Sequence, residues 1–488
     1  MIARLGVLVG GALFLGACAT TPVEPPPPSL DAVEATLARD IATLAGDDFA
    51  GRFPGTIGEE KTAAWLVDRY AEIGLQPAMG PGDWSQEFTI VRRSPRTDAD
   101  AAVASATRAG RTLHFGDGLL GAHQSRDQVE FADVPIVGVD PELERLKPRS
   151  LVNRAFVLPA SELATRGGQL ERAEPRVVLI TTTSSEEYDL AARLFARGRW
   201  RLDGDTDGIG LYLLSPDDSE DLAALIGDAA KRDPDGLGVI SYDTILEGSI
   251  AQDVERIETA NFVGRLPGTA EDAGAVLVLA HWDHLGASCR PESAPDRLCN
   301  GAVDNASGIA AMTEAVRLAA ADGPLDREII VLATSAEELG LLGAEAFVAD
   351  PPVPLPTIAA GFNIDTIAIG PRGMPVVVLG AGETPLDYGI SEVARTLGRE
   401  VVPTDLQAQF LRRQDGWVFL REGVPTVMAG STLADEEAFQ AFLQGPYHGP
   451  EDEVGPALEL GGAAEDVLLH AALIRYFGSL KTYPGAGG

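Results

Sequence analysis

The decisive part of this sequence consists of three short segments: AVLVLAHWDHLG (275–286), GAVDNASG (301–308) and LATSAEELG (332–340). The first segment begins with an apolar run of strand length, and His281 and Asp283 follow that run closely. Asp304 lies in the second segment, and the adjacent acids Glu337 and Glu338 lie in the third. Imidazole and carboxylate groups together suit zinc, and an acid beside such ligands can move protons during metal-assisted hydrolysis. The three segments therefore predict a site for divalent metal ions.

The second half of the chain alternates apolar, strand-like runs with helical stretches. We expect strands at 275–280, 329–333, 358–364, 376–379 and 424–428, and helices at 306–321, 385–397 and 464–480. Such alternation predicts an α/β fold with a mixed, mostly parallel sheet that helices cover on both faces. His281, Glu337, Glu338 and Asp365 each follow a predicted strand closely, and ligand sites in these folds lie beyond the carboxyl ends of strands. Three separate segments should therefore converge on one crevice.

The length of the chain predicts more than one domain, because 488 residues exceed the ~250–300 at which a single hydrophobic core stops growing. Amphipathic spacing predicts an N-terminal helix at 30–44, capped by Ser29, and a second helix that ends at Gly74. Between about residues 86 and 251 the sequence pattern changes to short β-like runs, with helical stretches near 186–197 and 220–231. We therefore divide the globular part into a main domain, at 30–85 and 252–480, and an inserted β-rich domain, at 86–251.

The N-terminus has the features of a targeting segment. Arg4 precedes a mostly apolar run that is shorter than the ~20 residues of a membrane helix, and Leu15-Gly16-Ala17-Cys18 resembles the lipobox of bacterial lipoproteins. This resemblance implies a signal peptide at 1–17, a lipidated Cys18 and a proline-rich tether at 18–29. The protein would then be exported and anchored to the bacterial outer membrane, facing the periplasm, and would contact the membrane only through Cys18. A plain secretory signal is the alternative.

The charge and the remaining cysteines narrow the possibilities further. A formal net charge of -35 excludes nucleic acid as a partner for the protein's own surface. Cys289 and Cys299 are ten residues apart, which in an exported chain favours a disulfide that closes a small loop. A metal-ligand role for this pair lacks a second pair of cysteines.

Several motifs occur in an order that resembles the zinc-dependent aminopeptidase family of co-catalytic exopeptidases, peptidase family M28. The motifs are GRFPGT and GLQPA, then ETANFVGRLPGT, AHWDHLG, GAVDNASG, TSAEELGLLGAEAF, NIDTIA, GVPTVM and YHGPED. The resemblance covers roughly residues 48–76 and 258–477. The inserted domain is similar in place and texture to the protease-associated domains that some members carry. One departure is Gln414-Asp415-Gly416, where many members have Ser-Asp-His, and it concerns the wall of the specificity pocket rather than the metals.

The resemblance implies two zinc ions per chain and a role for each candidate residue. The implied ligands are His281 and Asp365 at one ion, Glu338 and His448 at the other, and Asp304 at both. Glu337 would be the general base. Asp283 would accept the other N–H of the His281 imidazole, and Tyr447 would donate to the oxyanion of the tetrahedral intermediate.

These features predict an exported dizinc aminopeptidase that removes N-terminal residues from peptides, using a water activated by Glu337. A glutaminyl cyclase is the alternative enzyme class on this scaffold, but it uses one zinc. Carboxypeptidases and dipeptidases on related scaffolds share similar ligands. A non-catalytic receptor-like protein would be expected to have lost ligands. Taken singly, each of these residues also has a purely structural interpretation. Asp304, for example, could cap the N-terminus of a helix. The sequence gives no oligomeric state.

Overall fold

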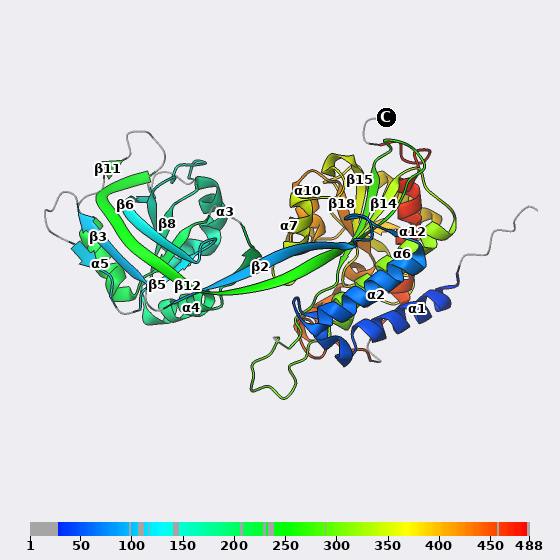
Figure 1. The fold of residues 1–488 in the computed structure, drawn as a ribbon, viewed down its shortest axis with the longest axis horizontal. Coiled ribbons are helices and arrows are strands. Elements are labelled where there is room, and N and C mark those ends of the chain that lie inside the picture. The colour runs from blue at the N-terminus through cyan, green and yellow to red at the C-terminus, as the bar shows by residue number, and fades with distance from the viewer. Residues whose placement is uncertain are drawn as a thin grey trace, which may run out of the picture.

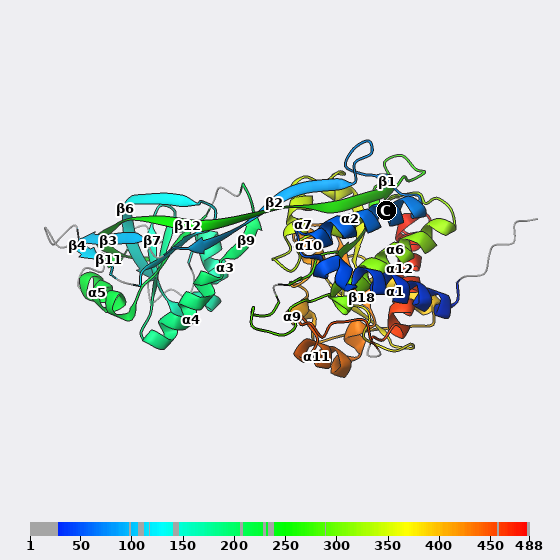
Figure 2. The same ribbon diagram turned by 60° about the horizontal axis from the view of Figure 1, so that its bottom comes forward.

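The computed structural model has two lobes joined by a pair of long strands (Figure 1). These strands are β2 (Ser85–Pro95) and β12 (Val239–Leu266), which pair antiparallel along the whole length of β2. They run along one side of the molecule from the smaller lobe into the larger (Figure 2). The structure describes residues 28–96, 99–105, 112–116, 118–139, 146–204, 208–227, 231–232, 239–287, 289–455 and 458–485.

The larger lobe is built on a mixed, mostly parallel sheet, as predicted. After β12 its strand order is β14 (Glu328–Thr334), β13 (Ala275–His281), β15 (Ile358–Asn363), β18 (Thr426–Gly430), β16 (Val376–Leu379) and β17 (Val401–Val402), and β1 (Gln76–Pro77) pairs on the other side of β12. The pairs β13–β14, β13–β15, β15–β18 and β16–β17 are parallel. Among the pairs that join these strands in the described chain, β1 with β12, β12 with β14 and β16 with β18 run antiparallel. Four neighbouring strands therefore end at the same edge of the sheet.

Helices cover both faces of this sheet, which explains the unbroken apolar run of β13. Val276, Val278 and Ala280 face one core, and Leu277 and Leu279 face another. The first core includes residues of α1 (Leu30–Leu44), α2 (Ile57–Ile73), α6 (Ser307–Ala321), α8 (Asp387–Thr396) and α12 (Gly461–Gly478). The second includes residues of α7 (Leu342–Ala349) and α10 (Gly416–Arg421). A strand that is buried on both faces needs an apolar residue at every position rather than at alternate ones.

The helix ends follow from local capping chemistry. The Ser29 hydroxyl accepts from the Ala32 N–H at the start of α1, and Gly74, with φ of 89°, ends α2 in the left-handed region. The helix expected near 220–231 lies earlier in the chain, as α5 (Pro216–Ile226). Its start is set by Ser215, whose hydroxyl accepts from the Asp218 N–H, and by the proline at its first position.

The smaller lobe has its own sheet and core. Its strands follow the order β4 (Thr112–His114), β3 (Asp100–Ser105), the first part of β12, β6 (Gln128–Val139), β7 (Ala155–Pro159), β8 (Val177–Thr181), β10 (Gly210–Leu213) and β5 (Leu120–His123), with β11 (Lys231–Arg232) also on β12. The helices of this lobe are α3 (Leu163–Ala173), α4 (Ser185–Ala196) and α5, and β9 (Arg199–Leu202) pairs with β2. Phe131, Tyr212, Leu246 and Ile250 are buried together in the core of the lobe.

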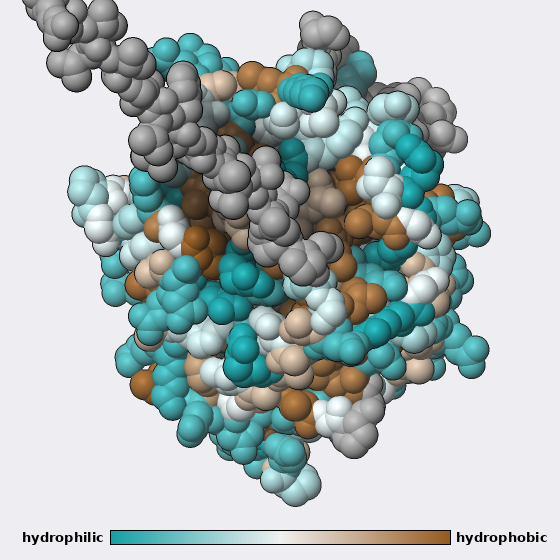
Figure 3. Space-filling view, turned by 90° about the vertical axis from the view of Figure 1, so that its right-hand side faces the viewer, coloured by the Kyte–Doolittle hydropathy of each residue, from teal (hydrophilic) through white to brown (hydrophobic). Residues whose placement is uncertain are grey.

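The outer surface of the larger lobe is mainly hydrophilic on the face that Figure 3 shows, with apolar residues in separate patches. Within the described ranges, no helix has both the length and the apolar character needed to cross a membrane. The predicted signal peptide at 1–17 and the predicted lipidation site Cys18 lie outside the described residues.

Candidate metal centre

The fold brings the five predicted metal ligands together at the carboxyl edge of the larger sheet. His281 is the last residue of β13, Glu338 lies in the loop after β14, and Asp365 comes two residues after β15. Asp304 comes from η3 (Ala302–Ala306), the short turn that leads into α6. His448 comes from the loop between α11 (Glu436–Gln444) and α12. The site is therefore assembled by the fold from five separate segments.

Asp304 occupies the middle of the cluster and uses its two oxygens in different directions. Its Oδ1 lies 3.3 Å from His281 Nε2, and its Oδ2 lies 3.4 Å from His448 Nε2. His281 Nε2 is also 3.5 Å from Asp365 Oδ1, and His448 Nε2 is 2.9 Å from Glu338 Oε2. The predicted ligands thus form two groups that share one carboxylate.

These separations fit bound zinc. Two ligands of one tetrahedral zinc, each about 2.0–2.1 Å from the ion, lie about 3.3 Å apart. The distances from His281 Nε2 to Asp304 and Asp365, and from His448 Nε2 to Asp304, are 3.3, 3.5 and 3.4 Å. Imidazole nitrogens and carboxylate oxygens are also the ligand types that zinc prefers. The residues present therefore suit two divalent cations with Asp304 between them.

The electrostatics of the cluster also favour cations. Burial raises the pKa of Glu337 well above its usual range and raises the pKa of Asp283 to about 7. Burial also acts to raise the pKa of Asp304, but its contacts with His281 and His448 outweigh burial and hold that pKa well below the usual range. Buried carboxylates without enough positive charge are costly. Divalent ions would supply the charge that the described side chains lack.

Asp283 differs from the prediction in the group that it offers to His281. The acceptor within hydrogen-bond distance of His281 Nδ1 is the backbone carbonyl of Asp283, at 3.2 Å, whereas the carboxylate Oδ1 is 3.8 Å away. That Oδ1 instead accepts from the Glu337 N–H at 3.1 Å. The carboxylate therefore fixes the loop that carries Glu337, and a main-chain group orients the imidazole.

Tyr447 and Asp365 both line a small, mainly apolar pocket. Its ring stacks on the His448 ring, with 3.7 Å between centroids, and its hydroxyl accepts from Arg413 Nη2 at 3.4 Å. The pocket has a volume of about 60 Å³. Its apolar lining residues are Leu379, Phe410, Met428, Leu433, Phe439 and Leu443. Gln414 also lines it, so the departure from the family pattern falls on this wall.

The sequence prediction missed several residues that organise the site. His284, the second histidine of AHWDHLG, has its Nδ1 2.6 Å from Glu338 Oε1. Asp452, the last residue of YHGPED, accepts from the N–H groups of Val303 and Asp304, at 2.8 and 3.0 Å, and so holds the turn that carries the shared carboxylate. Both residues lie inside motifs that the sequence displays, but nothing in the residue pattern reveals what they contact.

Arg52 is the third residue that the sequence prediction missed, and it anchors backbone segments that carry predicted ligands. Its guanidinium is buried, with 1% of its surface exposed, and its partners are main-chain carbonyls rather than acids. It donates to the carbonyls of Leu44, Trp282, Asn300 and Gly301, at distances between 2.6 and 2.9 Å. Arg52 therefore ties the N-terminal segment to two of the five segments that carry predicted metal ligands, those of His281 and Asp304.

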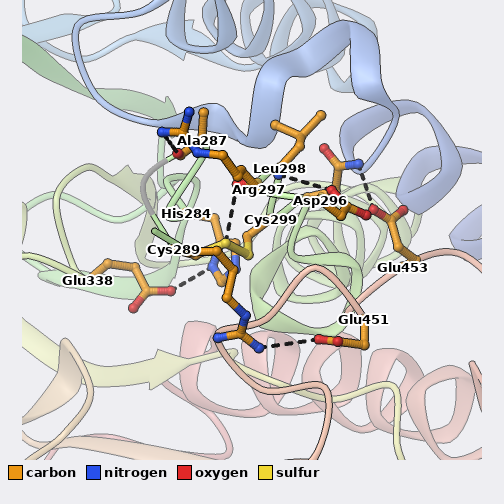
Figure 4. Close-up of a disulfide and its surroundings, with 12 residues drawn as sticks. His284, Ala287, Cys289, Asp296, Arg297, Leu298, Cys299, Glu338, Glu451 and Glu453 are labelled. Carbon is orange, nitrogen blue, oxygen red and sulfur yellow. Dashed lines mark hydrogen bonds and ion pairs between the residues drawn. A yellow bond between two sulfur atoms is a disulfide. The ribbon is translucent and has the colours of Figure 1, made fainter. Parts of the chain in front are cut away.

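Cys289 and Cys299 form a disulfide that closes a loop beside the metal cluster (Figure 4). The loop is also closed by the Cys299 N–H, which donates to the Gly286 carbonyl at 2.9 Å. Figure 4 shows the disulfide next to the His284 ring, with Glu338 on the other side of that ring. The loop therefore covers one side of the cluster and contributes no predicted metal ligand.

Residues 261–469 match the family model of peptidase family M28. A comparison with curated proteins found no match. Among solved structures, an aminopeptidase from Aneurinibacillus sp. strain AM-1 is 14% identical, with a TM-score of 0.47 over 91% of this chain and 94% of that chain. The zinc aminopeptidase BSAP from Bacillus subtilis is 17% identical, with a TM-score of 0.48 over 92% and 96%. A peptidase M28 precursor from Shewanella amazonensis SB2B is 15% identical, with a TM-score of 0.43 over 92% and 98%.

Proposed function

We propose that this chain, a family M28 peptidase by its residues 261–469, is an exported dizinc aminopeptidase that removes N-terminal residues from peptides. The observation that carries the proposal is the arrangement around Asp304. Its two oxygens face His281 and His448 separately, at 3.3 and 3.4 Å, as expected of a carboxylate shared by two ions. Asp365 and Glu338 complete one group each.

The residues of the site suit peptide hydrolysis. Bound zinc ions would polarise the peptide carbonyl and lower the pKa of a water towards ~7. Glu337, whose N–H is fixed by Asp283, would take the proton of that water and pass it to the leaving amine. The Tyr447 hydroxyl, above the His448 ring, would donate to the carbonyl oxygen as negative charge develops on it.

Two features of the site favour an amino-terminal substrate. The excess of carboxylates would attract a protonated α-amine, whereas it would repel a free α-carboxylate. The apolar pocket beside Asp365 would receive the side chain of the N-terminal residue. Its small volume and its lining favour an apolar side chain of moderate size over a charged one.

One observation favours a second candidate, a carboxypeptidase or dipeptidase. Arg413 lines the same pocket and contacts the Tyr447 hydroxyl, so its guanidinium could pair with a free C-terminal carboxylate of a short substrate. A glutaminyl cyclase would need one zinc rather than two. A receptor-like protein would be expected to have lost ligands, and the five predicted ligands are all present.

Three further parts of the proposal concern the rest of the chain. Residues 1–17 would be a signal peptide, and Cys18 would carry the lipid that anchors the protein to the outer membrane. The smaller lobe would be a protease-associated-like domain. Radiolabelled palmitate incorporation into the wild type but not into Cys18→Ser would support the lipid anchor, and equal incorporation would contradict it.

The decisive experiment assays the mature chain on five substrates while bound metal is counted. The substrates are a leucyl anilide, its N-acetyl derivative, a Leu-containing dipeptide with a free C-terminus, the same dipeptide with an amidated C-terminus, and a peptide with N-terminal Gln. An aminopeptidase should cleave the free-amine substrates, spare the acetylated one and lose activity with a chelator. A requirement for the free C-terminus would establish the dipeptidase instead, and cyclisation of the Gln peptide without hydrolysis would exclude a peptidase.

A further inference from the structure

We propose that His284 is a positioning residue that decides which oxygen of Glu338 faces the metal, a role that rests on the proposed metal pair. The two oxygens of Glu338 contact two different histidines. Oε1 is 2.6 Å from His284 Nδ1, and Oε2 is 2.9 Å from His448 Nε2. Oε1 is therefore held by a contact with His284, and Oε2 is directed towards His448 and Asp304.

The distances distinguish a positioning role from a ligand role for His284. Ligands of one tetrahedral zinc lie about 3.3 Å apart, whereas a charge-assisted N–H···O⁻ hydrogen bond is about 2.7–2.9 Å long. The contact between His284 and Glu338, at 2.6 Å, belongs with the hydrogen bonds. The contacts of Asp304 with His281 and His448, at 3.3 and 3.4 Å, have the zinc-ligand spacing. His448 Nε2 is also only 2.9 Å from Glu338 Oε2, but it lies 3.4 Å from Asp304 Oδ2 as well, whereas His284 contacts the opposite oxygen of Glu338. We therefore assign His284 to position this ligand. Because His284, Asp304 and Glu338 lie close enough to hold an ion themselves, the zinc-edge measurement below distinguishes the two roles.

This contact also identifies which group donates between His284 and Glu338. An ionised carboxylate only accepts hydrogen bonds, so Nδ1 must carry the proton that Glu338 Oε1 accepts. Nε2 is buried without a hydrogen-bond partner among the described residues. An imidazole N–H aimed at a ligand carboxylate is the arrangement by which outer groups orient metal ligands.

The surroundings of His284 hold its ring in place. The side chain of His284 is fully buried. The backbone N–H of His284 donates to the Arg52 carbonyl at 3.3 Å. Gly301 packs so closely that a Cβ there would lie 2.6 Å from the ring. The disulfide lies beside the ring (Figure 4). The ring therefore cannot follow Glu338 if the carboxylate turns, and the hydrogen bond is lost when it does.

This arrangement predicts that His284 controls the affinity of the metal ion that Glu338 and His448 would hold. Without the hydrogen bond, Oε1 is free and Glu338 can rotate or bind through both oxygens. Loss of such an outer contact lowers metal affinity by about 10–100-fold. The group made by His281 and Asp365 does not contact His284, so only one of the two ions should be affected.

The test compares His284→Asn with His284→Gln in the full chain. An Asn amide nitrogen can occupy the place of Nδ1 and still donate to Glu338, whereas a Gln amide nitrogen lies nearer the place of Nε2. Zinc affinity is measured by competition with a chromophoric chelator, and zinc content by elemental analysis. We expect His284→Gln to lower the affinity for one of the two zinc ions by about 10–100-fold. The zinc affinity of His284→Asn should stay within a few-fold of that of the wild type. His114→Asn, at an exposed position of the smaller lobe, is the matched control.

Equal zinc affinities for wild type and both variants would overturn the role, as would an equal loss in both. X-ray absorption at the zinc edge of the wild type gives an answer even where a variant fails to fold. An average of one imidazole per zinc agrees with His281 and His448 as the histidine ligands, and a higher average would make His284 a ligand. A wild type that binds no zinc would refute the metal pair itself, which is a different failure.

Discussion

The histidines at the carboxyl edge of the larger sheet and the buried histidine of the smaller lobe have different surroundings. Three histidines of the larger lobe each have a carboxylate oxygen between 2.6 and 3.3 Å away: His281, His284 and His448. In the smaller lobe, His123 is 5% exposed, and its Nδ1 accepts from the N–H groups of Ser125 and Arg126 instead. In the described part of the smaller lobe, no group of acids, histidines or cysteines is placed to hold a metal. A buried histidine becomes part of a reactive site only where carboxylates converge on it.

Of the changes that test this comparison, replacement of Asp304 should have the largest effect, and it should act on the larger lobe alone. Asp304→Ala would remove a ligand from both proposed metal groups at once, so we expect loss of both proposed zinc ions and a fall in kcat/KM of at least about 10⁴-fold. Elemental analysis and peptidase assays measure the two effects. Glu72→Gln, a change of an exposed acid, is the control. Full zinc content in Asp304→Ala would contradict a bridging role.

Replacing the proposed general base, Glu337, should have the next largest effect. Glu337→Gln keeps the size of the side chain and the N–H bond to Asp283, but it cannot accept a proton. We expect kcat to fall by about 10²–10⁴-fold with KM and zinc content nearly unchanged. Steady-state kinetics measures kcat and KM separately, and elemental analysis measures the zinc content. Cleavage at the wild-type rate would remove Glu337 from the reaction.

Arg52 offers a test of stability rather than of chemistry. Arg52→Met would leave four buried carbonyls without their donor, and each unsatisfied buried group costs about 1–3 kcal/mol. We expect a loss of several kcal/mol in the larger lobe and little change in the unfolding of the smaller lobe. Denaturant unfolding followed by lobe-specific hydrogen exchange separates the two. Arg39→Met, with an exposed guanidinium, should be nearly neutral.

The parts of the fold that depend on local pattern could be predicted from sequence. The apolar run before His281 gave β13, because a strand buried on both faces needs apolar residues throughout. Asp365 could be placed at the site for the same reason, since it follows the next such strand in space. The start of α5 was predicted too late because the cap formed by Ser215 and Pro216 precedes the apolar positions.

The contacts of loop residues could not be predicted, because they depend on how separate loops pack. Asp283 was expected to offer its carboxylate to His281, but the loop turns that carboxylate to the Glu337 N–H. His284 and Arg52 have no periodicity that indicates their roles. Their partners lie 54 to 249 positions away in the chain, apart from the Leu44 carbonyl, so only the assembled fold brings them together.

The smallest expected effect compares two buried histidines, one from each lobe, that have no carboxylate beside them. Burial lowers the pKa of His470 in the larger lobe and of His123 in the smaller lobe to about 4, from 6.5. The unfolded chain then binds more protons than the folded chain below pH 6.5, so each lobe should lose stability as the pH falls from about 6.5 to about 4. The full loss for His470 is on the order of 3 kcal/mol. His470 Nε2 lies 2.8 Å from the Ala429 carbonyl, which His470→Gln can still contact without titrating.

Thermal unfolding between pH 7 and pH 4 checks this comparison lobe by lobe. His470→Gln should flatten the pH dependence of the larger lobe alone, and His123→Asn that of the smaller lobe alone, in proportion to the burial of each ring. The exposed His114 is the reference, because His114→Asn should leave both profiles unchanged. A profile of the larger lobe that stays equally steep in His470→Gln would mean that the carboxylates of the metal centre dominate its acid sensitivity. In that case the contrast between the lobes would extend to their stability.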